Sequence, residues 1–322
     1  MKKLYISLSG YTLTDDEKRL LARPEITGLV IFSENICKEQ DSQNVNSDDI
    51  LKRLKSLIEQ VKTINSQIEI AIDHEGGRVN RLRYIHLGRM LSPSTYIPDF
   101  REGSTSRMRQ HLDDDFALLK GLGIDRVFGP CVDIDDEISE VISKNLRSYG
   151  DNYSQIAQLA GVYINRANAA GLKVCLKHFP DHGLCKADSH IELPEDLRSY
   201  EQIKDVIDHY KYLIDSYDID MIMTAHLHMP NLEQSEILPF SSNFTKNIKE
   251  QLGDVKIITD CLSMGAIKGS YSQRISKAVA AGNDYVMLTH ADTAKLIRSL
   301  DSLNDAFDEN MDDLPVNNSV FI

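Results

Sequence analysis

The sequence lacks several features that would place it in a particular class of protein. Its 322 residues contain no run of 18 apolar residues, so we expect no membrane-spanning helix. No lysine- and arginine-rich segment offsets the net charge of −13. Because phosphate binding needs a basic surface, we do not expect nucleic acid as a partner. The first residues hold two lysines but too short an apolar run for a signal peptide. These absences favour a soluble, cytoplasmic protein without membrane insertion.

Cysteine is sparse, and its pattern excludes two further classes. The chain has an odd, widely spaced set of five, namely Cys37, Cys131, Cys175, Cys185 and Cys261. No CxxC pair occurs, so neither a disulfide framework nor a thiolate zinc site is indicated. Cys175 and Cys261 fall inside apolar runs and are expected to be small core residues. A reducing compartment fits this usage.

What the chain does contain is a regular alternation of strand-like and helical segments. Eight short apolar runs read as strands, at Leu4–Leu8, Gly28–Ser33, Ile68–Asp73, Asp125–Phe128, Lys173–Leu176, Met221–His226, Lys256–Asp260 and Asp284–Thr289. Helical patterns separate or follow them, at about 14–21, 48–64, 106–122, 153–170, 199–216, 244–252, 272–281 and 291–300. Such alternation predicts a parallel sheet of the α/β class.

The number of strands favours a closed barrel over an open sheet. Eight strands and eight helices in 322 residues match a (β/α)8 TIM-type barrel forming a single domain over 1–322, with a short acidic tail from about residue 304. The alternative is an open doubly wound sheet. Neither a GxGxxG motif nor a Walker loop follows any strand, which weakens the nucleotide-binding form of that alternative.

Polar residues follow four of the predicted strands. Asp73 ends the third, Lys177 and His178 follow the fifth, His226 ends the sixth and Asp260 ends the seventh. In a barrel these strand ends meet at one mouth, where catalytic residues gather. The sequence therefore predicts a site built from these segments.

Asp260 can be read in two ways. A carboxylate at the end of the apolar run IITD can face a substrate and attack an electrophilic carbon. The less favoured reading is that it caps a helix beginning at Cys261, because aspartate is a good N-cap residue.

The segment from Leu176 to His190, LKHFPDHGLCKADSH, is the richest in titratable groups. Asp188 precedes His190 by two residues, and a carboxylate in contact with an imidazole suits a proton shuttle near neutral pH. A mobile surface pair is the other reading. His178 and His182 are four residues apart, as metal ligands on a helix can be, but Pro180 lies between them. His226-x-His228 is a second candidate metal pair.

Asp73, Arg78 and Arg81 form a further polar group around Gly76-Gly77. A carboxylate can accept hydrogen bonds from adjacent sugar hydroxyls, and a guanidinium donates several in fixed geometry. An ion pair within the loop explains the spacing equally well. Arg147 lies in another polar loop and by itself is an ordinary arginine.

Taken together, these segments resemble glycoside hydrolase family 3, in particular its single-domain bacterial β-N-acetylglucosaminidases of peptidoglycan recycling. Residues 72–79, IDHEGGRV, are similar to the family's IDQEGGRV, and residues 177–183, KHFPDHG, to its KHFPGHG. Residues 188–190 match its DSH, and TDCLSM at 259–264 resembles SDDLSM. Residues 34–36, RSYG at 147–150 and TAH at 224–226 also fit, so the resemblance runs from about residue 5 to 290.

The resemblance implies roles for individual residues. Asp260 matches the family's catalytic nucleophile, and His190 its acid/base, with Asp188 as the partner of that histidine. The positions that hold N-acetylglucosamine match Asp73, Arg81, Arg147, Lys177 and His178. The implied reaction is retaining hydrolysis of terminal β-linked N-acetylglucosamine by a monomer, on a small carbohydrate such as a muropeptide, with no metal or organic cofactor. The identity of the aglycone stays open.

Three residues depart from the family pattern. Asp181 replaces a glycine, Cys261 replaces the aspartate after the nucleophile, and His74 replaces a glutamine. Asp181 is the change expected to alter the loop or the substrate range. Two other functions stay open beside hydrolysis, namely a phosphorylase that uses phosphate in place of water and a sugar-binding barrel without activity.

Overall fold

Eight parallel strands close into a barrel. The computed structural model describes residues 3–37, 46–85, 87–185, 193–265 and 267–311. The strands are β1 (Leu4–Ile6), β2 (Ile26–Ile31), β3 (Glu69–Gly76), β5 (Arg126–Cys131), β6 (Lys173–Phe179), β7 (Met221–Thr224), β8 (Lys256–Cys261) and β9 (Tyr285–Leu288). Each is hydrogen-bonded to the next in this order, and β1 also pairs with β9, which closes the cylinder. The predicted (β/α)8 barrel is confirmed.

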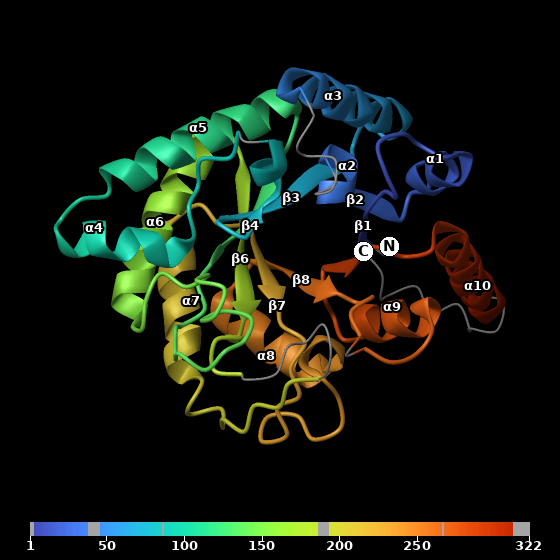
Figure 1. Cartoon of the computed structure of the whole chain (residues 1–322). Helices are drawn as coiled ribbons and strands as arrows, with labels where there is room; N and C mark the ends of the chain where they lie inside the picture. Colours follow the sequence, from blue (N-terminus) through green and yellow to red (C-terminus); the bar gives the residue numbers. More distant parts are fainter. Residues whose placement is uncertain (1–2, 38–45, 86, 186–192, 266, 312–322) are drawn as a thin grey trace.

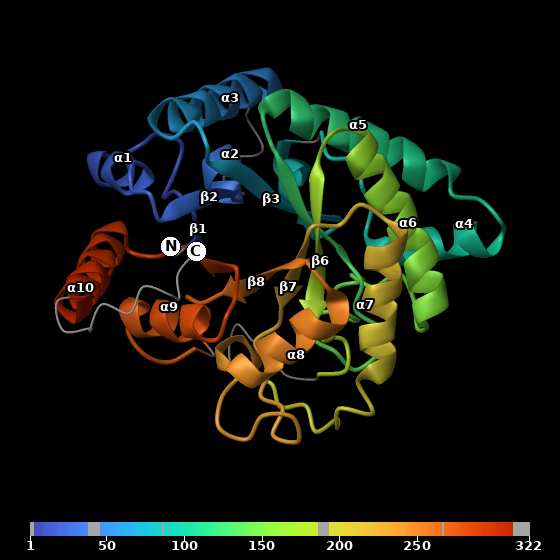
Figure 2. The same cartoon turned by 180° about the vertical axis from the view of Figure 1, so that it is seen from behind.

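Helices surround the strands, as the opposite views in Figures 1 and 2 show. They are α1 (Asp15–Leu21), α3 (Ser47–Ile64), α5 (Ser106–Leu122), α6 (Tyr153–Ala169), α7 (Lys204–Ser216), α8 (Ser242–Leu252), α9 (Tyr271–Ala280) and α10 (Thr293–Met311), with short helices α2 (Ser33–Ile36) and α4 (Ile97–Arg101). Local sequence sets several of their starts. Thr14 and Glu17 form a capping box at α1, and Ser270 and Gln273 form one at α9.

Two predicted helix bounds differ from the structure, and one short strand was not predicted. Helix α7 begins at Lys204 rather than at residue 199, because the segment before it forms turns. Helix α10 continues past residue 300 to Met311, and its buried stripe of Leu296, Leu300 and Leu303 explains the extension. The two-residue strand β4 (Val79–Asn80), which pairs antiparallel with β3, was not predicted.

The barrel interior is filled in layers by every second residue of the strands. Its middle layer is apolar and takes side chains from all eight strands, including Tyr5, Val30, Ala71, Phe128, Cys175, Met221, Ile258 and Met287. Because side chains alternate along a strand, the interior residue two positions further on lies one layer nearer the carboxyl end. On β3, the apolar Ala71 is thus followed by Asp73 and then Glu75. On β6, Cys175 is followed by Lys177. On β8, Ile258 is followed by Asp260. The polar strand ends are the continuation of the core.

The amino-terminal end of the barrel is closed by a buried arginine. The guanidinium of Arg126 is 2% exposed and donates to Glu69 at 2.8 and 3.2 Å and to Asp220 at 2.6 and 2.8 Å. The hydroxyl of Tyr5 also donates to Glu69. These contacts offset the cost of burying the guanidinium charge.

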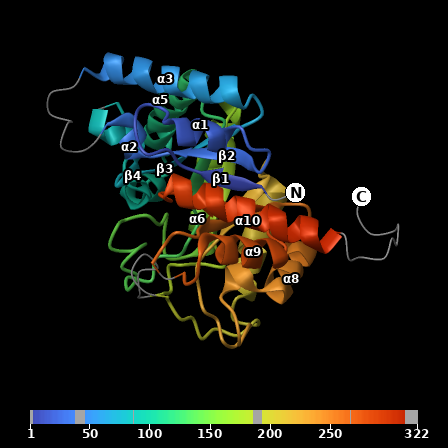
Figure 3. The ribbon, with the colours of Figure 1, turned by 90° about the vertical axis from the view of Figure 1, so that its right-hand side faces the viewer.

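Figure 3 shows the start of the chain on one side of the molecule and the long loops after the central strands on the other. Those loops therefore surround the carboxyl-terminal mouth of the barrel. Within the described ranges, no helix has both the length and the apolar composition needed to cross a bilayer.

Candidate active site

A cavity of about 460 Å³ opens at the carboxyl ends of the strands. Its size suits a small ligand. Six of the predicted site residues line it, namely Asp73, Arg81, Arg147, Lys177, His178 and Asp260. They come from three strands, a 3-10 helix that begins at Arg81 and the loop that holds Arg147, so the barrel brings together residues far apart in sequence. Asp188 and His190 lie outside the described residues.

Asp73 holds two cations at the floor of this cavity. Its Oδ1 accepts a hydrogen bond from Lys177 Nζ at 2.8 Å, and its Oδ2 accepts one from Arg81 Nη2 at 2.9 Å. Burial would raise the pKa of Asp73, but the charges of Lys177 and Arg81 outweigh that effect and hold it well below its usual range. The expected ion pair therefore exists, and it lies in the cavity wall.

Glu75 adds a second carboxylate to the same group. It is 1% exposed, and Arg147 donates to both of its oxygens at 2.7 and 2.8 Å, while Lys177 Nζ lies 2.7 Å from its Oε1. Burial opposes ionisation, but the two cations lower the pKa of Glu75 to about 2. The same two carboxylates, Asp73 and Glu75, raise the pKa of Lys177 despite its burial. All of these groups are therefore charged at neutral pH.

His178 is fixed by contacts on both ring nitrogens. Arg147 Nη2 lies 3.2 Å from Nε2, and Nδ1 lies 2.7 Å from Asp133 Oδ2. A guanidinium can only donate, so Nε2 accepts and Nδ1 carries the proton that it donates to Asp133. Asp133 Oδ1 also accepts from the backbone N–H of His178 at 2.8 Å. One aspartate therefore sets both the tautomer and the position of the imidazole.

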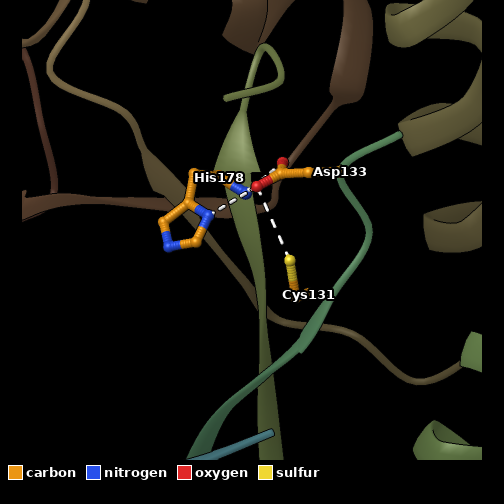
Figure 4. A group of neighbouring side chains, drawn as sticks. All are labelled: Cys131, Asp133 and His178. Carbon is orange, nitrogen blue, oxygen red and sulfur yellow. Dashed lines mark hydrogen bonds and ion pairs between the residues drawn. The ribbon is translucent and has the colours of Figure 1, made fainter. Parts of the chain in front are cut away.

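Cys131, Asp133 and His178 form a group whose ligand-type atoms lie within 4.8 Å of one another, as the ligands of a metal ion do (Figure 4). His178 Nδ1 and Asp133 Oδ2 are 2.7 Å apart. Two such ligands of one tetrahedral zinc stand about 3.3 Å apart at bonds of about 2.0 Å. The Cys131 thiol, 3.6 Å from Asp133, completes a hydrogen-bonded group, and burial raises its pKa. In this arrangement His178 and Asp133 share a hydrogen bond, and their separation is shorter than that of two ligands of one zinc ion.

Asp260 reaches the cavity from the end of β8. Its Oδ1 accepts a hydrogen bond from the N–H of Cys261 at 2.6 Å. The helix-cap reading is wrong, because turns follow β8 and the next helix, α9, begins only at Tyr271. Burial would raise the pKa of Asp260, but the neighbouring imidazoles of His226 and His178 offset this, and the pKa lies below its usual value. Asp260 is thus an ionised carboxylate facing the cavity.

Three other predicted candidates do not converge there. Arg78 is exposed and donates to Asn145 at 2.9 Å. His226 is buried, with Nε2 2.9 Å from the carbonyl of Cys261. His228 lies 3.3 Å from Glu195 and is absent from the cavity lining. The two histidines of the candidate metal pair His226-x-His228 therefore contact different partners.

Sequence reasoning missed two residues of this site. Glu75 follows Asp73 by two positions on β3, and strand alternation could have placed both on the interior face. Asp133 had no such signal, because it lies in a loop after β5 and meets His178 only through the fold. His74, between the two acids, points the other way and pairs with buried Asp115 at 2.9 Å.

Comparison with known proteins gives consistent matches over most of the chain. The family model for the glycosyl hydrolase family 3 N terminal domain matches residues 4–319. The beta-hexosaminidase of Idiomarina loihiensis is 33% identical over 310 residues, which cover 94% of this chain and 88% of that protein. The beta-hexosaminidase of Pseudomonas aeruginosa is 31% identical over 294 residues, with 87% and 80% covered.

A solved structure agrees with these relatives. The crystal structure of NagZ from Neisseria gonorrhoeae in complex with N-trifluoroacetyl-D-glucosamine superimposes with a TM-score of 0.79 at 26% identity. The match covers 95% of this chain and 85% of that one. A barrel with a polar cavity at its mouth and these relatives define a glycosidase. More narrowly, the chain belongs to glycosyl hydrolase family 3.

Proposed function

We propose that this glycosidase removes terminal β-linked N-acetylglucosamine with retention of configuration. One observation carries the proposal. The ionised Asp260 lies in the same cavity as a set of paired charges that suit the hydroxyl groups of a sugar. The relatives named as beta-hexosaminidases, and the neighbour crystallised with a glucosamine derivative, support the choice of sugar.

The sugar would be held by Asp73, Arg81, Arg147, Lys177 and His178. Carboxylates accept hydrogen bonds from hydroxyl groups, and the cations donate to their oxygens. Because each charge already has a partner, the cavity offers oriented dipoles and ion pairs rather than a single strong charge. Such a lining is suited to an uncharged sugar with many hydroxyls.

The chemistry would run in two steps. Asp260 attacks the anomeric carbon, a bond forms between its oxygen and that carbon, and the bond to the leaving oxygen breaks. His190, oriented by Asp188, gives its proton to the leaving oxygen. In the second step His190 takes a proton from water, the water oxygen bonds to the anomeric carbon, and Asp260 leaves as a carboxylate. Two displacements on one carbon retain its configuration.

The remaining features of the proposal follow the family resemblance. The substrate would be a small carbohydrate, with muropeptide fragments as the leading class. The protein would act in the cytoplasm as a monomer and as one barrel domain over residues 1–322. It would need no metal or organic cofactor.

Replacement of Asp260 by alanine tests the nucleophile. The variant should release less than a thousandth of the nitrophenol that the wild type releases from 4-nitrophenyl N-acetyl-β-D-glucosaminide, a loss on the order of 10³-fold or more. Asp254→Ala is a matched control, because Asp254 is exposed and lies just before β8 at the opposite end of the barrel. Turnover by Asp260→Ala close to that of the control would contradict the assignment.

Analysis of the product by NMR tests the reaction itself. We expect β-N-acetylglucosamine as the first product, at the same rate with and without phosphate. A dependence of the rate on phosphate, with a sugar 1-phosphate as product, would establish the phosphorylase alternative instead. Tight binding of the sugar without turnover would favour an inactive sugar-binding barrel.

A further inference from the structure

Asp181, which replaces a glycine of the family motif, has an unusual position for an aspartate. Its backbone φ is 124°, in the region that favours glycine. The side chain is 1% exposed and makes three hydrogen bonds. Its oxygens accept from the N–H of Gly183 at 2.7 Å, from the N–H of Ile134 at 3.2 Å and from the hydroxyl of Tyr153 at 3.1 Å. A strained backbone held by three contacts indicates that the side chain has a role.

These contacts join three parts of the structure. Gly183 belongs to the loop after β6, Ile134 to the turn after β5, and Tyr153 to the first turn of α6. The backbone N–H of Asp181 also donates to the carbonyl of His178 at 2.7 Å. The backbone of Asp181 therefore contacts the peptide of His178 directly. Its side chain contacts Ile134, the neighbour of Asp133, and Asp133 in turn holds the imidazole of His178.

We propose that Asp181 is a positioning residue for sugar recognition, which fixes the turn at Asp133 against the loop after β6 and thereby sets the place of the His178 imidazole in the cavity. The inference rests on the proposed function, in which His178 holds the sugar. Glycine at this position can supply the backbone angle but none of the three side-chain contacts. This chain thus adds a rigid support where the family motif has none.

The electrostatics of the pocket around Asp181 agree with this role. Burial, together with the negative charge of nearby Asp133, raises the pKa of Asp181 to about 8. The titratable and charged groups that interact with it come from several parts of the fold. They are Asp133 from the loop after β5, Tyr153 from α6, Tyr210 from α7, Arg198 from the segment before α7, and Cys185 from its own loop. At neutral pH Asp181 is thus mainly protonated beside an ionised Asp133. Above pH 8 a second negative charge forms next to the carboxylate that holds His178.

Arg198 connects the far end of the same loop to this residue. Its Nη2 lies 3.5 Å from the carbonyl of Asp181, and its guanidinium pairs with Asp196 at 2.6 Å. Residues 181 and 196–198 flank the stretch that contains the predicted acid/base pair. Asp181 therefore lies at the point where residues before and after this stretch are in contact.

Two variants and one control separate positioning from general stability. Asp181→Gly restores the family residue and is compatible with the backbone angle, so it should fold. Asp181→Asn keeps one acceptor oxygen but cannot ionise. Glu137→Gln removes an exposed carboxylate from the same turn that holds Asp133 and serves as the control. Circular dichroism at the working temperature checks that each variant is folded.

The first measurement needs no sugar. In protein labelled with ¹⁵N-histidine, the proton of His178 Nδ1 should give a far-downfield signal, assigned by its loss in His178→Gln. Asp181→Gly should shift or broaden this signal, Asp181→Asn should change it less, and the control should leave it unchanged. An identical signal in the wild type and in Asp181→Gly would overturn the inference.

The second measurement uses the nitrophenyl substrate. Asp181→Gly should raise KM on the order of tenfold, with a smaller change in kcat, because a displaced binding group weakens the hold on the sugar. Asp181→Asn should recover most of this loss and should remove a change of KM between pH 7 and 9 that the wild type shows. Wild-type KM in Asp181→Gly would overturn the inference. If the wild type itself released no nitrophenol, the proposed function would fail, while the histidine signal would still decide the position of His178.

Discussion

The guanidinium of Arg147 donates one hydrogen bond to each oxygen of the buried Glu75 carboxylate, at 2.7 and 2.8 Å. The same guanidinium lies 3.2 Å from Nε2 of His178. Glu75 is therefore not a free acid in the cavity wall. It holds the guanidinium of Arg147 so that Nη2 also reaches His178, while Nη1 donates to the carbonyl of Val141 at 3.4 Å.

Replacement of Glu75 by glutamine should reduce both stability and sugar binding. Only one of the two terminal atoms of the glutamine amide can accept a hydrogen bond, whereas both oxygens of Glu75 do. Arg147 and Lys177 would therefore stay buried without the negative charge of Glu75. Loss of one partner from a buried ion pair costs about 3 kcal/mol. Urea unfolding gives the stability, and titration with N-acetylglucosamine gives the affinity. Glu140→Gln, at a half-exposed carboxylate that pairs with the exposed Lys144, is the control. Equal midpoints for the two variants would contradict the prediction.

The charged floor should also set how the protein responds to acid. The folded-state pKa of Glu75 is about 2, below its ordinary value of 4.5. A lowered carboxyl pKa contributes stability above the unfolded value, and that contribution is lost as the pH falls toward the folded value. We therefore expect stability to fall between pH 4.5 and 2. Glu75→Gln should show a shallower decline in this range, measured by urea unfolding at several pH values.

Asp181 should act in the opposite direction. Its folded-state pKa is raised from 3.8 to about 8, so its protonated form is the one favoured by folding. This contribution is complete below pH 3.8 and is lost as the pH rises toward 8. Relative to wild type, Asp181→Asn should thus gain stability from pH 5 to pH 9. Thermal unfolding at the two pH values measures the difference, and a constant gap between the proteins would count against the raised pKa.

Arg126 allows stability and catalysis to be separated. Arg126→Met would remove the buried cation that Glu69 and Asp220 share at the amino-terminal end of the barrel, and would leave them the exposed Lys173 at 3.2 and 3.9 Å. We expect a loss of about 3 kcal/mol in the free energy of unfolding. KM for the nitrophenyl substrate should stay unchanged at a temperature where the variant is folded, because the middle apolar layer lies between Arg126 and the cavity. A large change in KM would show that the two ends of the barrel are coupled.

His190 can be tested through the leaving group. His190→Ala should slow the hydrolysis of substrates with poor leaving groups far more than that of 4-nitrophenyl N-acetyl-β-D-glucosaminide, because only a poor leaving group needs a proton in the first step. Steady-state kinetics over a series of aryl leaving groups measures the slope. The same loss for every member of the series would speak against an acid role.

The fold was predictable because its signals are local. Each strand is a short apolar run, and each helix repeats its buried face within its own sequence. The start of α7 and the end of α10 were harder to predict from the sequence. The same residue types occur in turns and in helices, and a helix with a buried stripe can continue through a polar stretch. The hairpin strand β4 has two residues, too few to carry a periodic pattern.

The site was predictable only in part. Asp73, Lys177 and Asp260 stand at strand ends, and the barrel geometry brings such residues together. The partners that fix them depend on distant pairings. Asp133 is 45 positions from His178, and Arg147 is 72 positions from Glu75. Nothing in either local sequence indicates these contacts, and they follow only from the closed barrel.

The arginine that fills the amino-terminal end of the barrel limits how ligands can move. With Arg126 and Glu69 packed there and an apolar layer above them, the described residues leave no passage through this end of the barrel for a ligand in the cavity. In the proposed reaction the aglycone, nearer the mouth, would therefore depart first, and the cleaved sugar would follow it through the mouth. If the proposed reaction is correct, free N-acetylglucosamine should consequently compete with substrate, and its accumulation should slow the enzyme by occupying the floor of the cavity.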